Sequence, residues 1–117
     1  MVQTPTNTNQ WVTVCSLSDI APNTGVCALL KGTQVAIFRI GETDEVYAIG
    51  NYDPFSKAFV LSRGIVGDRN GILKVASPIY KQNFNLKTGE CLDDETASVP
   101  SYPVRVVDGS IQLSAID

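Results

Sequence analysis

The chain of 117 residues contains no histidine. Histidine is the usual general base near neutral pH and the commonest metal ligand in proteins. Its absence excludes a Ser-His-Asp or Cys-His catalytic arrangement, a catalytic zinc site of the usual kind and a haem with an axial histidine. Any chemistry of this chain must therefore use other side chains.

Cysteine is scarce and scattered. Cys15, Cys27 and Cys91 are odd in number, lie far apart and form no Cys-x-x-Cys pair of the kind that binds zinc or exchanges disulfides. We expect three free thiols, buried or half-buried in strands. Free thiols are typical of a reducing compartment, so the expected location is cytoplasmic.

Long apolar runs and an excess of positive charge are also lacking. No apolar run is long enough to span a bilayer, and the polar residues 1–10 lack the basic and apolar regions of a signal peptide. The formal net charge is −3, so no large positive field exists to hold nucleic acid or an anionic membrane. The sequence predicts neither of these as a partner.

The residues that are present indicate one packed domain. Hydrophobic residues make up 44% and charged residues 18% of the chain, which is the balance of a globular protein. Residues 1–10 offer little to bury, and we expect a flexible N-terminal tail there. The predicted β domain covers residues 11–117.

Short segments rich in Val, Ile and Tyr alternate with Gly, Asn, Asp and Pro at intervals too short for helices of several turns. This pattern predicts an all-β protein, a sandwich or a barrel. The predicted strands are 11–16, 26–31, 33–40, 45–50, 64–68, 72–77, 83–86, 104–107 and 110–113.

Turn residues support this interpretation. Lys31-Gly32, Asp68 to Gly71 and Asp108-Gly109 each place residues that tolerate positive φ between two apolar runs, and they predict three hairpins. Two stretches that contain proline, 51–58 and 93–102, are predicted to be loops.

The second half of the chain resembles a known family. Residues 77–91 read Ser-Pro-Ile-Tyr-Lys-Gln-Asn-Phe-Asn-Leu-Lys-Thr-Gly-Glu-Cys. They resemble the second cluster-binding segment of Rieske ferredoxins, Cys-Pro-x-His-Gly-x-x-Phe-Asp-Leu-x-Thr-Gly. Residues 45–53 resemble the strand and first segment, which carries Cys-x-His. The resemblance implies a Rieske-like antiparallel β-sandwich of two packed sheets, with loops 51–57 and 78–82 meeting at one end.

The ligand positions of that family have all changed. Asn51 and Asp53 stand where the family has Cys and His, and Ser77 and Tyr80 where it again has Cys and His. A Rieske cluster needs two thiolates on one iron and two imidazoles on the other. The resemblance thus implies a Rieske-like domain without an iron–sulfur cluster. Lys81 replaces a glycine of the family pattern.

Within this scaffold, residues 53–55, 61–64 and 76–82 are similar to the small subunits of bacterial assimilatory NAD(P)H nitrite reductases. In that family the small subunit carries no cofactor. A large subunit holds flavin, an iron–sulfur cluster and sirohaem and reduces nitrite to ammonium. The resemblance implies a subunit of an oxidoreductase with no catalytic residue, no metal ligand and no cofactor of its own.

Two other functions stay open. One is a free-standing module that binds a small ligand between the two loops, and the other is a docking domain for a different redox enzyme. Copurification of a large coloured partner would separate a subunit from a free-standing module.

The four former ligand positions allow three interpretations. Asn51, Asp53, Ser77 and Tyr80 could hold a hard cation, although one carboxylate among neutral oxygens makes a weak site. They could hydrogen-bond to one another across the two loops and so hold the loops together in place of the cluster. They could also contact a partner directly, because loop ends on a rigid β scaffold are favoured places for recognition.

The residues around the two loops are candidates for partner binding. Phe55 and Tyr80, together with Ile79, either fill the space of the missing cluster or face a partner. The candidate partner-binding residues are Phe55, Lys57, Arg63, Tyr80 and Lys81, whose cations could steer an acidic surface.

Overall fold

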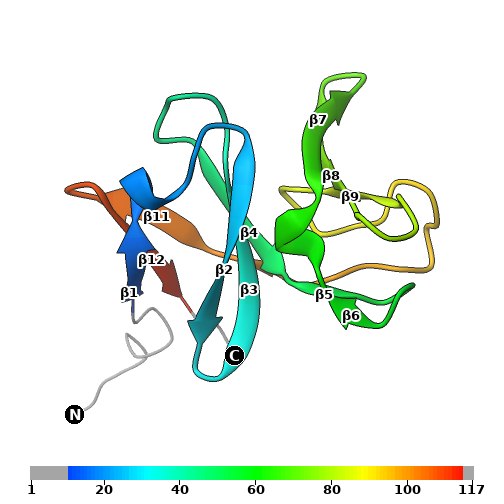
Figure 1. Ribbon diagram of the computed structural model, residues 1–117, viewed down its shortest axis with the longest axis horizontal. Helices are drawn as coiled ribbons and strands as arrows, with labels where there is room; N and C mark the ends of the chain where they lie inside the picture. The colour runs from blue at the N-terminus through cyan, green and yellow to red at the C-terminus, as the bar shows by residue number, and fades with distance from the viewer. Residues whose placement is uncertain (1–10, 115–117) are drawn as a thin grey trace, which may run out of the picture.

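The computed structural model describes residues 11–114, so the predicted tail, residues 1–10, lies outside the described residues (Figure 1). Their secondary structure consists of short strands and two single-turn 3-10 helices. The elements are β1 (Trp11–Ser16), η2 (Leu17–Asp19), β2 (Thr24–Leu30), β3 (Thr33–Arg39), β4 (Val46–Gly50), β5 (Tyr52–Asp53), β6 (Ala58–Phe59), η3 (Leu61–Arg63), β7 (Ile65–Arg69), β8 (Ile72–Ala76), β9 (Asn83–Asn85), β10 (Ser101–Tyr102), β11 (Val104–Val107) and β12 (Ser110–Ser114). Among these residues, no helix has the length and apolar character needed to cross a membrane.

The all-β prediction is confirmed, but the strands of residues 11–114 divide among four antiparallel sheets and not two. Their orders are β1-β12-β11, β10-β4-β3-β2, β5-β6 and β7-β8-β9. We call the four-stranded sheet β10-β4-β3-β2 the main sheet. The two extra sheets arise because the chain leaves the main sheet after Gly50, makes the short β5–β6 hairpin, and returns to it only at β10. The β7–β9 sheet and its loops lie on one side of the molecule in Figure 1.

Strand β3 is buried on both faces and joins two hydrophobic cores. Val35 and Ile37 point into a core shared with Ile111 and Leu113 of β12, between the two larger sheets. Phe38, on the opposite face, belongs to a second core with residues of the β7–β9 side. Alternate residues of a strand point to opposite faces, so a continuous apolar run indicates a central strand.

The second core supports both loops of interest. Leu61 of η3, Val75 of β8 and Phe84 of β9 are fully buried there against the main sheet. In the chain, η3 follows the first loop and β6, whereas β8 and β9 lie before and after the second loop. The scaffold therefore fixes the ends of each loop.

The three predicted hairpin turns are confirmed. Each pairs a residue in the left-handed region with a following glycine. Their φ values are 50° and 83° at Lys31-Gly32, 52° and 85° at Asn70-Gly71, and 50° and 78° at Asp108-Gly109.

Three short strands lie in stretches that were predicted to be loops. Strands β5 and β6 pair within 51–59, and β10 pairs with β4 through Ser101↔Ile49 and Tyr102↔Ala48. A two-residue strand has no periodicity of its own, because its pairing is determined by the neighbouring strand.

The cysteine prediction is wrong about the burial of Cys27 and about the placement of Cys91 in a strand. Cys15 is half-buried and Cys91 is buried, but Cys27 is exposed. Cys27 lies on β2, the edge strand of its sheet. Cys91 pairs with Phe84 in an isolated bridge outside the regular strands.

Candidate functional site

A hydrogen bond joins the two loops at the former ligand positions. The Ser77 hydroxyl donates to Asp53 Oδ2 at 2.5 Å, and both side chains are fully buried. Asp53 ends β5, whereas Ser77 follows β8 directly, so the bond connects the first loop to the β7–β9 sheet. We refer to this Asp53–Ser77 bond as the clasp.

Further donors surround the Asp53 carboxylate. The Phe55 backbone N–H donates to Oδ1 at 2.9 Å, and the Ser56 hydroxyl donates to Oδ2 at 2.9 Å. Burial by itself would raise the pKa of Asp53, but the hydrogen bonds from Ser77, Phe55 and Ser56 outweigh it and hold the pKa below its usual value. The carboxylate is therefore ionised at neutral pH.

Asn51 is buried beside the clasp but bonds to other partners. Its Oδ1 accepts from the Ser62 backbone N–H at 2.7 Å, and its Nδ2 donates to Gln34 Oε1 at 3.0 Å. These bonds tie the end of β4 to η3 and β3. Asn51 is thus fully engaged within the first loop and the main sheet.

Tyr80 is not drawn into the same network. It is 61% exposed, and its neighbour Ile79 is 46% exposed. Of the four former ligand positions, the structure joins Asp53 to Ser77, places Asn51 in a neighbouring network and leaves Tyr80 at the surface.

Lys81 stands at a glycine position of the family pattern and has a backbone conformation that favours glycine. Its φ is 69°, a conformation that glycine adopts without strain. The Lys81 backbone N–H donates to the Ser77 carbonyl at 3.1 Å, and its Nζ donates to the Pro78 carbonyl at 3.1 Å. The Lys81 side chain therefore folds back over its own loop.

The remaining candidate residues divide into one inward and two outward side chains. Phe55 is half-buried and packs against Phe84 of the second core, with ring centroids 6.2 Å apart. It fills space beneath the loops. Lys57 and Arg63 are exposed.

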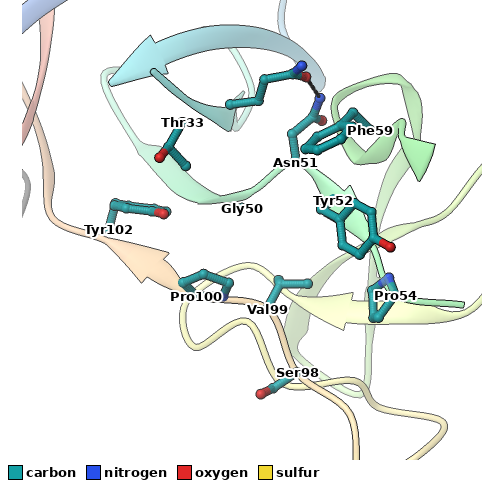
Figure 2. A pocket seen from close by; sticks show the side chains of 11 residues that line it. Thr33, Gly50, Asn51, Tyr52, Pro54, Phe59, Ser98, Val99, Pro100 and Tyr102 are labelled. Atoms are coloured by element: carbon teal, nitrogen blue, oxygen red, sulfur yellow. Dashed lines mark hydrogen bonds between the residues drawn. The ribbon is translucent and has the colours of Figure 1, made fainter. Parts of the chain in front are cut away.

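A small apolar cavity lies beside the first loop, and sequence reasoning missed it (Figure 2). Its volume is about 160 Å³. Tyr52 borders it because neighbouring residues of a strand point to opposite faces, so Tyr52 turns away from the side that Asp53 faces. The walls are formed chiefly by Tyr52, Pro54, Phe59, Val99, Pro100 and Tyr102.

Two observations define what this cavity can do. Tyr52 and Phe59 contact each other with ring centroids 5.1 Å apart, and no charged side chain lines the cavity in the described part of the chain. It can accept an apolar group of a few atoms. Its walls come from segments about fifty residues apart, so no local pattern could have revealed it.

The fold, with two pinned loops at one end, defines a Rieske-like domain. A family model described as a Rieske-like [2Fe-2S] domain matches residues 10–114. The chain is 53% identical over 105 residues to the nitrite reductase (NADH) small subunit of Salmonella typhimurium, covering 90% of this chain and 97% of that one. The chain belongs to the family of Rieske-like nitrite reductase small subunits.

Two further relatives are informative. The solution structure of the NAD(P)H nitrite reductase small subunit from Erwinia carotovora superimposes with a TM-score of 0.80 at 51% identity, covering 92% of this chain and 82% of that one. The NAD(P)H nitrite reductase large subunit of Klebsiella oxytoca is 42% identical over 101 residues, which are 86% of this chain and 10% of that one.

The residues at the former ligand positions do not fit the cluster that the fold family implies. They offer an amide, a carboxylate, a hydroxyl and a phenol, whereas the cluster needs two thiolates and two imidazoles. The Asp53 carboxylate and the Ser77 hydroxyl already bond to each other. Within residues 11–114, no group of three or more Cys, Asp and Glu side chains is placed to hold a metal ion.

Proposed function

We propose that the chain is the small subunit of a cytoplasmic NAD(P)H nitrite reductase and that it supports a large subunit that reduces nitrite to ammonium. In this proposal the chain holds no cofactor and supplies no catalytic residue. Flavin, an iron–sulfur cluster and sirohaem belong to the large subunit. We expect no nucleic-acid or membrane partner.

The observation that carries the proposal is the clasp. In a Rieske-like domain the loops hold the redox centre, and here a carboxylate and a hydroxyl at two ligand positions hold each other. An electron-transfer role within this chain would need a redox centre, which these side chains cannot bind. A role in contact with a partner uses the scaffold and needs no such centre.

The relatives support a physical association. The Klebsiella oxytoca protein contains a similar segment within a chain named as the large subunit. A domain that occurs in one protein as part of the large chain and in others as a separate small subunit is expected to lie against the large chain in both arrangements.

The test is to express the chain with its large subunit and isolate it through an affinity tag. The large, coloured subunit should copurify. The large subunit prepared without this chain should reduce nitrite more slowly, or lose its activity sooner, than the complex of the two. A chain that purifies alone, with large-subunit activity and stability unchanged by its addition, would overturn the proposal and favour a free-standing binding module.

A further inference from the structure

The exposed charges of the two loop segments are all of one sign. Segments 51–63 and 77–82 carry three cations, Lys57, Arg63 and Lys81, and one carboxylate, Asp53. All three cations are exposed, whereas Asp53 is fully buried and hydrogen-bonded. The two segments sum to +2 in a chain of net charge −3, so the remainder carries −5. The net charge of the two loop segments is therefore opposite in sign to that of the rest of the chain.

The cations are tied to the clasp through the backbone. The Lys57 N–H donates to the Asp53 carbonyl at 2.7 Å, and the Lys81 N–H donates to the Ser77 carbonyl at 3.1 Å. Each lysine is thus hydrogen-bonded through its backbone to one residue of the Asp53–Ser77 pair. Arg63 precedes Gly64, which is packed against the Ala76 carbonyl beside Ser77.

Exposed apolar side chains lie on the same loop as Lys81. Tyr80 is 61% exposed and Ile79 is 46% exposed, and the Ile79 backbone N–H faces the Ser77 hydroxyl at 3.4 Å. Contiguous exposed apolar patches with a polar rim are typical of interaction sites. Lys57, Arg63, Ile79, Tyr80 and Lys81 together are called the tip below.

We propose that the tip docks on an acidic patch of the large subunit, with Tyr80 and Ile79 entering an apolar recess that carboxylates surround. This inference rests on the proposed function and specifies the partner surface. Positive charge at the tip attracts an acidic patch and accelerates its encounter, while the apolar side chains provide the desolvated centre of the contact. A second copy is disfavoured as the occupant because two positive tips repel each other.

The chain contains matched controls for charge. Lys31, Lys57 and Lys81 are all exposed and all have positive φ, at 50°, 59° and 69°. Replacing each by glutamate therefore changes net charge and backbone strain equally. Lys31 lies in the turn between β2 and β3, outside both loop segments.

The apolar centre has a matched control as well. Leu29, on edge strand β2, is 64% exposed, close to the 61% of Tyr80. Tyr80→Ser and Leu29→Ser each remove one large side chain of similar fractional exposure, at two different positions.

The experiment measures the affinity of the whole chain and its variants for the purified large subunit at low and at high salt. Lys57→Glu and Lys81→Glu should each weaken binding at least about tenfold at low salt, and Lys31→Glu less than about twofold. Salt at about 1 M, where the Debye length is about 3 Å, should shrink the tip losses. Tyr80→Ser should weaken binding at both salt concentrations, whereas Leu29→Ser should leave it unchanged.

The outcomes separate the two proposals. An unmodified chain with no affinity for the large subunit would overturn the proposed function and this inference together. A chain that binds, but whose tip variants bind as tightly as the unmodified protein or no worse than Lys31→Glu, would overturn the tip alone. Self-association that Tyr80→Ser abolishes would identify a second copy as the occupant and would also overturn it. Lys57 tests the tip independently of the bond from Lys81 Nζ to Pro78.

Discussion

Asp53 shows how a single buried carboxylate can replace a metal centre as the link between two loops. A buried charge is costly unless donors surround it. Here the donors are Ser77 from the opposite loop and Ser56 and the Phe55 N–H from its own loop. A bond to the opposite loop ties the two together, as shared cluster ligands do in Rieske ferredoxins. The hydrogen-bonding interpretation of the former ligand positions is therefore the one that Asp53 and Ser77 support.

Removing the Ser77 hydroxyl should destabilise the protein. Ser77→Ala removes the shortest hydrogen bond to the buried carboxylate of Asp53, and a hydrogen bond to a charged group contributes about 1.5–3 kcal/mol. The free energy of unfolding in urea should fall by that amount. The control is Ser101→Ala, a change at an exposed serine, which should stay within about 0.5 kcal/mol. Equal stability of the two variants would mean that the clasp contributes nothing.

Stability should fall in acid partly through Asp53. The pKa of Asp53 is lowered in the folded protein, so the unfolded chain takes up its proton first as pH falls through the ordinary value of about 3.9. The contribution is fully present above that pH and is lost as pH drops through the lower folded value.

The acid dependence can be assigned to Asp53 by substitution. The pKa values of Asp93 and Asp94 are also lowered, mainly by donors from Asn83 and Thr96, so the unmodified chain alone does not isolate Asp53. Between about pH 5 and about pH 2.5, a range that spans the ordinary pKa of aspartate, the free energy of unfolding of Asp53→Asn should fall less than that of the unmodified chain. Urea midpoints across this range measure it, and parallel curves would contradict the assignment.

At the scale of elements, glycines with positive φ occur in two different surroundings. In the hairpin turns they have open space around them. At Gly89 the surroundings are packed: the Val99 N–H donates to the Gly89 carbonyl at 2.8 Å, and a Cβ at Gly89 would overlap the Val99 carbonyl. This contact joins the long loop 93–102 to the turn that follows β9.

Gly89→Ala should therefore be far more damaging than Gly109→Ala. Both glycines have nearly the same φ, 82° and 78°, so the conformational cost of alanine, about 1 kcal/mol, is shared. Only at Gly89 must the added Cβ also displace backbone atoms, and overpacking of this kind typically adds a further cost of about 1–3 kcal/mol. Thermal or urea unfolding of the two variants gives the comparison. Similar losses of stability would show that loop 93–102 shifts readily to make room for the added Cβ.

At the scale of the whole molecule, two hydrophobic cores share strand β3. One core holds the two larger sheets together, and the other supports the loops through Leu61, Val75 and Phe84. Burial on this scale stabilises a domain of about a hundred residues without a metal. The loop end of the fold is thus anchored by packing as well as by the clasp.

The purified chain should be colourless and indifferent to chelators. Attempted anaerobic reconstitution with iron and sulfide should leave no visible absorption of a two-iron cluster, because no thiol or imidazole occupies a ligand position. The melting temperature should not change on addition of EDTA, since a fold that gains no stability from metal loses none on its removal. Two irons per chain, or a large fall in melting temperature, would contradict both this expectation and the cofactor-free proposal.

Local patterns in the sequence determined most of the fold. Alternating apolar residues and turn dipeptides such as Asp108-Gly109 act over a few residues, so the longer strands and three hairpins could be predicted within one or two residues at each end. The absence of histidine likewise excluded whole classes of site without any structure.

Only the tertiary structure decided which side chains meet. Ser77 and Asp53 are 24 residues apart, and whether they bond or bind a cation depends on how two loops pack, which no local propensity encodes. The same holds for the inward position of Phe55, the exposure of Cys27 on an edge strand and the pairing of β10 with β4. Each of these depends on a neighbour distant in sequence, because burial and pairing are properties of the assembled fold and not of the segment that shows them.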